Sequence, residues 1–204
     1  MKRFGLFSLL MLILLSSCAT NASQRERDSS ALQELGLLYL DKGHYEEAIN
    51  TFDKALALDG QNSEVLYNKV LALIANKAYQ RAIDTAEFGY ALFPANLEFL
   101  MAKALSEKEL GKDNEALHTY VRLLNLDPGN AARRALVMEF ALEKGFASVA
   151  KEQALFLLSV HQEENRAFSV LTTLEGEESW YALAYEFMKE AVEESPESPL
   201  IQSR

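Results

Sequence analysis

Hydrophobic residues between Ser29 and Asn62 recur at the spacing of two consecutive helices. The first apolar stripe has members three or four positions apart, as one face of an α-helix requires: Leu32, Leu35, Gly36 and Tyr39. Gly43 interrupts the pattern and can adopt the left-handed conformation that ends a helix. The second stripe contains Tyr45, Ala48, Ile49, Phe52, Ala55 and Leu56. The segment is therefore predicted to be a helical hairpin, with Asn62 as the N-cap of the next helix.

This hairpin pattern returns every 34 residues, and a column of alanines shows the period without a gap: Ala48, Ala82, Ala116, Ala150 and Ala184. Columns of different chemistry agree with it: Asn62, Asn96 and Asn130; Gly43, Gly111 and Gly145; Pro94 and Pro128. A small residue fits where two helices approach closely. One hairpin cannot bury both of its stripes, whereas stacked hairpins can. We therefore predict an all-α array of about five hairpins, an architecture that usually binds other proteins.

The first hairpin resembles a tetratricopeptide repeat (TPR) in three stretches, 35–39, 43–48 and 52–55. The resemblance is strong over residues 29–62, 63–96 and 97–130. It is degenerate over 131–164, where Arg134 takes an apolar position and the proline is missing near Gln162, and divergent over 165–198. Residues 199–204 form a tail. The resemblance implies a right-handed α-solenoid; the alternative is an irregular helical domain with accidental periodicity.

The N-terminal segment has the character of an export signal rather than of the repeats. Lys2 and Arg3 precede an apolar run over residues 4–15, which is short for a transmembrane helix. The run leads to Cys18, the one cysteine of the chain, and this arrangement resembles a bacterial lipoprotein signal. The resemblance implies removal of residues 1–17 and acylation of Cys18, with palmitate among the acyl groups. The alternative is an ordinary secretion signal with an incidental cysteine.

Residues 18–28 are then expected to be a lipidated cysteine followed by a polar, flexible tether. Stretched out, ten such residues reach roughly 35 Å, so the repeats would work close to the membrane. Because Ala19 rather than aspartate follows Cys18, resemblance to Gram-negative lipoproteins favours the outer membrane, at its periplasmic face. In a Gram-positive cell the same anchor would hold the protein at the outer face of the plasma membrane.

The charge balance narrows the range of partners. The chain has 20 basic and 30 acidic residues, and loss of residues 1–17 removes only Lys2 and Arg3, which leaves a net charge of −12. An acidic chain of this kind is not expected to bind nucleic acid, which requires a basic surface. The three histidines, His44, His118 and His161, fall at different phases of the repeat and have no metal-ligand spacing. We expect no enzyme activity, no metal and no cofactor.

The TPR resemblance implies that the first helix of each repeat lines a concave, partner-binding face. The inward-facing phase selects Gln33, Leu37, Glu64, Tyr67, Leu71, Ile74, Glu98, Met101 and Leu105, and continues with Glu139, Leu142 and Glu143. This apolar strip with an acidic edge suits an apolar segment with basic flanks. An alternative of equal weight is that some of these residues pack between the first helices.

The carboxylate clamp known from some members of the family is not expected here. That clamp needs lysine, asparagine and arginine at set places on the concave face. Asn68 takes one of these places, but the others hold Gln33, Leu37, Glu98 and Ala102. Glu98 would repel the carboxylate that the clamp binds.

Two functions fit these observations. The first is a membrane-anchored scaffold or adaptor that supports assembly of an envelope complex of the pilus, secretin or outer-membrane type. The second is an accessory component that docks a solute-binding protein or a transporter.

Overall fold

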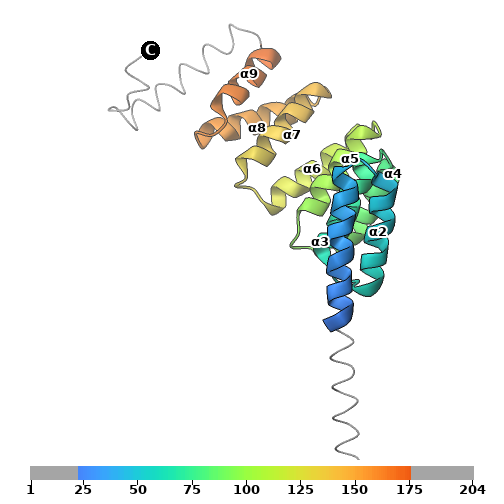
Figure 1. Cartoon of the computed structure of the whole chain (residues 1–204). Coiled ribbons are helices and arrows are strands. Elements are labelled where there is room, and N and C mark those ends of the chain that lie inside the picture. Colours follow the sequence, from blue (N-terminus) through green and yellow to red (C-terminus); the bar gives the residue numbers. More distant parts are fainter. Residues whose placement is uncertain (1–22, 176–204) are drawn as a thin grey trace, which may run out of the picture. The chain divides into compact units, whose positions relative to one another are not determined.

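The computed structural model describes residues 23–175, and every regular element within that range is a helix (Figure 1). A first helix covers residues 23–41. The helices that follow it are α2 (Tyr45–Leu58), α3 (Ser63–Ala75), α4 (Tyr79–Leu92), α5 (Glu98–Glu109), α6 (Asp113–Leu126), α7 (Ala131–Glu143), α8 (Ala147–Ser159) and α9 (Glu164–Glu175). This architecture confirms the predicted all-α fold of consecutive helical hairpins.

The chain divides within α6 into two compact units, unit 1 up to Thr119 and unit 2 from Tyr120. In unit 1, α2 packs on α3, α3 packs on α4, and α4 packs on α5, while α3 also contacts α5. In unit 2, α7 and α8 form a hairpin, and α9 packs on both. The contact of α3 with α5 and that of α7 with α9 join the first helices of successive repeats.

The first helix begins before the predicted start of the repeats. Residues 23–28, expected to belong to the flexible tether, are helical and continuous with the rest of this helix. Local contacts support the extension, because Gln24 Nε2 donates to Asp28 Oδ1 at 2.8 Å and Ser30 Oγ donates to the Glu26 carbonyl at 3.0 Å. The helix is joined to the first repeat by Ser29, whose Oγ donates to the Ala55 carbonyl at 3.0 Å.

The glycine column marks the turns inside the hairpins. Gly43, Gly111 and Gly145 have φ angles of 75°, 72° and 79°, in the left-handed region that glycine adopts without steric cost. Lys77 stands in the same column and adopts the same conformation with φ of 58°. The turn therefore requires the left-handed backbone even where the sequence supplies no glycine.

The asparagine column caps the helices that start each new repeat. Asn62 Oδ1 accepts from the Val65 amide at 3.1 Å, and Asn130 Oδ1 accepts from the Arg133 amide at 3.1 Å. Asn96 accepts from the Glu98 amide at 3.2 Å, one residue before the N-cap position of α5. These bonds satisfy backbone donors that the first helical turn leaves without partners.

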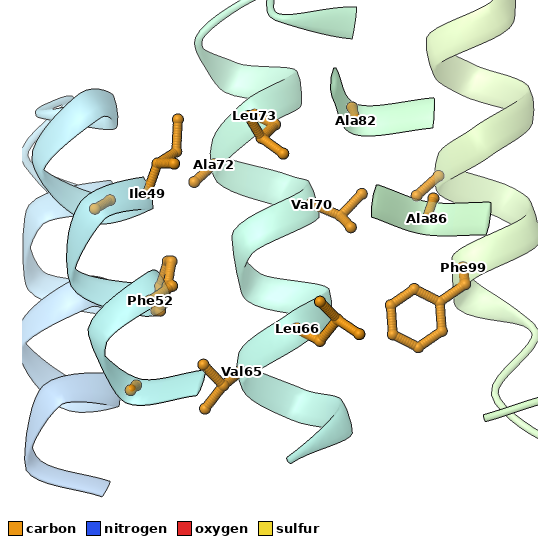
Figure 2. Packing of buried hydrophobic residues seen from close by; sticks show 13 residues of the cluster. Ile49, Phe52, Val65, Leu66, Val70, Ala72, Leu73, Ala82, Ala86 and Phe99 are labelled. Atoms are coloured by element: carbon orange, nitrogen blue, oxygen red, sulfur yellow. The ribbon is translucent and has the colours of Figure 1, made fainter. Parts of the chain in front are cut away.

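Small residues allow the helices within each unit to approach closely. Every alanine of the 34-residue column within the described range is fully buried: Ala48, Ala82, Ala116 and Ala150. Around the first two, side chains from α2, α3, α4 and α5 interdigitate, among them Phe52, Leu73 and Phe99 (Figure 2). The fifth alanine, Ala184, lies outside the described residues.

The degenerate fourth repeat folds as a regular hairpin with its own core. Ala135, Met138, Leu157 and Leu171 are buried together in this second cluster. At its end, where the proline column fails, His161 and Glu163 adopt φ angles of 53° and 52°. The missing proline is thus replaced by a turn with left-handed residues, and α9 follows at Glu164.

Candidate protein-binding surface

The nine residues predicted for the concave face lie on three first helices of unit 1, and we call them the first-helix strip. They are Gln33 and Leu37 on the helix 23–41, Glu64, Tyr67, Leu71 and Ile74 on α3, and Glu98, Met101 and Leu105 on α5. Leu37, Glu64 and Leu105 are exposed, and the other six residues are half-buried. Leu37 and Leu105 are two of the large apolar side chains that the described chain leaves exposed.

Part of the first-helix strip also packs between helices. Tyr67 meets Phe99 edge-on, with ring centroids 5.7 Å apart and an interplanar angle of 89°. Ile74 packs against the same buried cluster. The two roles considered for the strip therefore coexist in it: Tyr67 and Ile74 join the core, while Leu37 and Leu105 face solvent.

The structure brings Tyr67 and Glu98 together from neighbouring first helices. Burial raises the pKa of the Tyr67 hydroxyl, and the negative charge of Glu98 raises it further. A tyrosine hydroxyl is protonated at neutral pH even without this shift, so it can donate a hydrogen bond there. The surface there combines an aromatic edge, a hydroxyl donor and a carboxylate.

The places of the carboxylate clamp are occupied by residues that cannot form it. Asn68 and Ala102 are buried, so neither presents a polar group at the surface of the strip. Glu98 is half-buried beside Tyr67, where its charge opposes the approach of another carboxylate. The structure therefore agrees with the sequence: the described residues at the clamp positions form no basic pocket.

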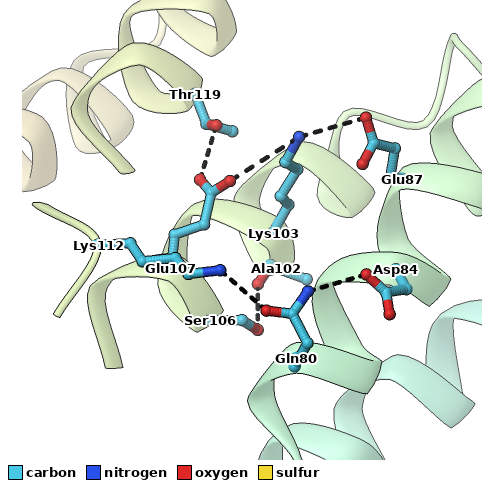
Figure 3. Close-up of polar contacts among 9 residues, drawn as sticks. All are labelled: Gln80, Asp84, Glu87, Ala102, Lys103, Ser106, Glu107, Lys112 and Thr119. Carbon is cyan, nitrogen blue, oxygen red and sulfur yellow. Dashed lines mark hydrogen bonds and ion pairs between the residues drawn. The ribbon is translucent and has the colours of Figure 1, made fainter. Parts of the chain in front are cut away.

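A buried polar network in unit 1 was not found from the sequence. Glu107 is only 5% exposed, although the equivalent positions hold Tyr39, Leu73 and Ala141. Its carboxylate accepts from Thr119 Oγ1 at 2.7 Å and lies 3.8 Å from Lys103 Nζ (Figure 3). Lys103 also pairs with Glu87 at 3.5 Å. The sequence did hint at the Lys103–Glu87 pair, because an acid and a lysine recur 34 residues earlier as Asp53 and Lys69. In the structure that earlier couple is also an ion pair, at 2.6 Å.

Over 23–175, no group of three or more His, Cys, Asp or Glu side chains is placed to hold a metal ion. The side chains of His44, His118 and His161 are exposed. None of the helices in this range has the length and apolar character needed to cross a membrane. Cys18, the predicted lipidation site, lies outside the described residues.

One known family model matches the first hairpin of the chain. Residues 29–62 match the family model described as "Tetratricopeptide repeat". The first hairpin is therefore similar to a tetratricopeptide repeat. Among curated proteins, the chain is 39% identical over 70 residues to intraflagellar transport protein 70A2 of Mus musculus. That match covers 34% of this chain but only 10% of the relative, so the chain corresponds to a small part of that protein.

Solved TPR proteins share the fold of the described residues. A tetratricopeptide repeat protein from Parabacteroides merdae aligns with a TM-score of 0.65 at 19% identity, over 86% of this chain and 70% of that chain. The first TPR of Spaghetti (RPAP3), solved bound to the HSP90 peptide SRMEEVD, aligns with a TM-score of 0.53 at 23% identity, over 59% of this chain and 98% of that chain. These likenesses place the helical hairpins in the TPR fold.

Proposed function

We propose that this chain is a membrane-anchored TPR scaffold that binds a protein segment on its first-helix strip and supports assembly of an envelope complex. The observation that carries the proposal is the composition of the strip. Leu37 and Leu105 are exposed and Leu71 and Met101 are half-buried on three successive first helices, and Glu64 and Glu98 add negative charge. Apolar anchors with basic flanks complement such a surface.

A protein segment is the class of ligand that the fold favours. The RPAP3 repeat with the same fold holds a peptide, so TPR hairpins of this kind can take an extended segment. The residues of the strip set the chemistry of this chain's own ligand. With Glu98 in the strip and Asn68 buried, we infer a basic rather than an acidic segment.

The proposed address rests on the N-terminal sequence. An acyl group on Cys18 would leave only residues 19–22 between the lipid and the described start of the first helix. Each buried CH₂ contributes about 0.8 kcal/mol, so two or three acyl chains hold a protein firmly at a bilayer. The repeats would then recruit their partner close to the membrane surface, in a Gram-negative cell at the periplasmic face of the outer membrane.

Partner capture by variants of the strip tests the binding proposal. Leu71→Glu and Met101→Glu each place a charge on the half-buried strip, and we expect capture from crosslinked, solubilised envelopes to fall at least about tenfold. Leu92→Glu is the matched control, since Leu92 is an exposed leucine on the second helix α4. Unchanged capture by folded Leu71→Glu and Met101→Glu proteins would overturn the proposal. The identity of the captured protein separates an assembly factor from a transport accessory.

The proposed lipid anchor at Cys18 has a separate test. Cys18→Ala is expected to leave unprocessed precursor and to abolish labelling with radioactive palmitate, while the wild-type chain is processed and labelled. Acyl label that persists in Cys18→Ala would show that the anchor is elsewhere.

A further inference from the structure

Unit 1 has a groove that the first-helix strip does not use. It has a volume of about 480 Å³ and lies among α2, α3 and α4. Its lining residues are Asp53, Leu56, Ala57, Leu66, Lys69, Asp84, Thr85 and Phe88. Phe88 is 57% exposed, the highest exposure among the large apolar side chains described. A single exposed ring is common on protein surfaces, so Phe88 is informative here because open space lies beside it.

The repeat register relates this groove to a filled site in unit 2. Each of its eight lining residues has a counterpart 68 residues later, two periods along the chain, and the cation Lys69 corresponds to the apolar Val137. Leu66 corresponds to Arg134, Asp84 to Glu152, Thr85 to Gln153, and Phe88 to Phe156. The aromatic ring and the acid on the second helix are thus kept, while the leucine and the threonine are replaced by longer polar side chains.

In unit 2 the arginine occupies the position next to the aromatic ring. The guanidinium carbon of Arg134 lies 3.6 Å from the centroid of the Phe156 ring. Its Nη1 donates to Gln153 Oε1, and its Nη2 donates to the Pro128 carbonyl at 2.8 Å. Arg134 is only 8% exposed, and burial lowers the pKa of its guanidinium while the charge of Glu152 opposes that shift. A planar cation stacked on a ring beside a carboxylate is a favourable arrangement.

In unit 1 no arginine stands at the position of Arg134, and the groove's own cation, Lys69, pairs with Asp53. Leu66 and Thr85 are too short to cover the ring of Phe88, and the groove remains open between them. The intermediate repeat differs again, since Arg122 stands at the aromatic position. Among these three equivalent places, an exposed ring with open space beside it occurs at Phe88.

The charges of the groove favour a cation. Lys69 Nζ pairs with Asp53 Oδ1 at 2.6 Å, so these two charges offset each other. Asp84 accepts from the neutral Gln80 amide at 2.9 Å (Figure 3), which leaves its negative charge uncompensated by that bond. The groove as a whole therefore carries one net negative charge beside the ring.

We infer that this groove receives an arginine side chain presented by a protein partner, which stacks on Phe88 as Arg134 stacks on Phe156 in unit 2. The charge of Asp84 would favour that arginine as the charge of Glu152 favours Arg134. The site is a second contact surface, apart from the first-helix strip. It adds a specificity determinant, because a guanidinium stacks and bonds in a way that an ammonium does not.

Nuclear magnetic resonance of the full chain in detergent micelles tests this inference with three acetylated, amidated tripeptides. Ala-Arg-Ala should shift the backbone amides of Thr85 and Phe88 saturably, Ala-Lys-Ala should bind more weakly, and Ala-citrulline-Ala, the neutral isostere, should give no saturable shift. Phe88→Ala should weaken Ala-Arg-Ala about two- to fivefold, and Asp84→Asn by a similar factor.

The matched control is Leu71→Ala in the first-helix strip, which should leave Ala-Arg-Ala binding unchanged. Phe88 and Asp84 are exposed, so their variants should keep the helical circular dichroism of the wild type. Equal binding of the citrulline peptide, no saturable shift with Ala-Arg-Ala, or unaltered binding by Phe88→Ala and Asp84→Asn would each overturn the inference. Because partner capture is tested at Leu71 and Met101, failure there and failure here are distinguishable.

Discussion

At the scale of single residues, the turn position of each hairpin is fixed by backbone conformation rather than by side-chain contacts. A Cβ added to Gly111 or Gly145 would meet no atom within 4 Å. What these glycines supply is therefore their positive φ. Lys77 shows that the fold also forms with a side chain at this position, at the steric cost that an L-residue bears in the left-handed region.

Exchanging glycine and non-glycine residues in this column should change stability in opposite directions. Gly111→Ala is expected to lower the free energy of unfolding by about 1 kcal/mol, since its cost is confined to the backbone. Lys77→Gly is expected to raise it by up to about 1 kcal/mol, reduced by the greater freedom of glycine in the unfolded chain. Urea unfolding followed by circular dichroism measures both. A stabilising Gly111→Ala substitution would contradict this account.

The asparagine N-caps also have one local role, which is to satisfy backbone amides at the start of a helix. Asn62 accepts from the Val65 amide and so satisfies a donor that α3 cannot satisfy itself. Asn62→Ala should lower the free energy of unfolding by about 1 kcal/mol, and Asn62→Asp, which keeps the acceptor oxygen, should retain most of it. Equal losses for the two variants, measured by urea unfolding, would show that the side-chain acceptor is not what matters.

At the scale of elements, close approach of helices is provided by more than the alanine column. Gly36 on the first helix faces Phe52 of α2, and a Cβ added there would lie 2.4 Å from Cε1 of that ring. Phe52 is fully buried, so its ring cannot move out into solvent to relieve this contact. Gly89 stands in the same relation to Phe99.

Gly36→Ala tests this contact. Alanine has the better helix propensity by about 1 kcal/mol, so propensity alone predicts stabilisation. The clash with Phe52 acts against it, and overpacking of this kind typically costs about 1–3 kcal/mol. We therefore expect a net loss of stability, measured by thermal unfolding. Gly60→Ala is a control, because its Cβ would meet only the Leu56 carbonyl at 3.5 Å. A gain in stability for Gly36→Ala would contradict the packing account.

The contact between α7 and α9 includes an ion pair with a defined pH dependence. Arg166 Nε donates to Glu139 Oε1 at 2.7 Å, and this bond lowers the pKa of the Glu139 carboxyl. A carboxyl whose folded pKa is depressed contributes stability above its unfolded pKa of about 4.3, and that stability is lost as the pH falls through the folded pKa.

Removing the ion pair should therefore lower the free energy of unfolding at neutral pH but not in acid. Glu139→Gln is expected to cost less than about 1 kcal/mol at pH 7, because both side chains are partly exposed to solvent. In acid below the folded pKa of Glu139, the difference from the wild type should vanish. Urea unfolding at the two pH values measures this, and an equal difference at both would rule out the carboxylate as its source.

At the scale of the whole molecule, the 34-residue period predicts most of the fold. The alanine, glycine and asparagine columns placed the helices, their turns and most of their caps, since each column has one local physical role. The extent of the first helix was missed, because residues 23–28 are polar and carry no apolar stripe. Local hydrogen bonds, rather than burial, accompany the helix there.

The candidate sites were less predictable than the fold. The position of each residue within the 34-residue repeat placed the nine strip residues on first helices. It could not show that Tyr67 and Ile74 pack in the core whereas Leu37 and Leu105 face solvent. The groove at Phe88 exists because the side chains around it leave open space beside the ring. This open space becomes apparent only when Leu66 and Arg134 are compared at equivalent places in the folded repeats.

The acidic first-helix strip also predicts a partner that should not bind. The HSP90 peptide SRMEEVD, which the RPAP3 repeat holds, should show no measurable affinity for this chain in fluorescence anisotropy. Glu98 opposes its carboxylates, and buried Asn68 and Ala102 offer no basic group. Micromolar binding of this peptide would refute the assignment of an acidic, clamp-free strip.

The central claim is that the first-helix strip holds a protein partner, and photo-crosslinking at Leu71 tests it most directly. A benzophenone side chain at position 71 should give one discrete crosslinked protein in intact cells, and the same probe at the exposed Leu110, beyond the strip, should not. Adding Met101→Glu should reduce the adduct at position 71 at least about tenfold. No adduct at position 71, or one that Met101→Glu leaves unchanged, would contradict the claim.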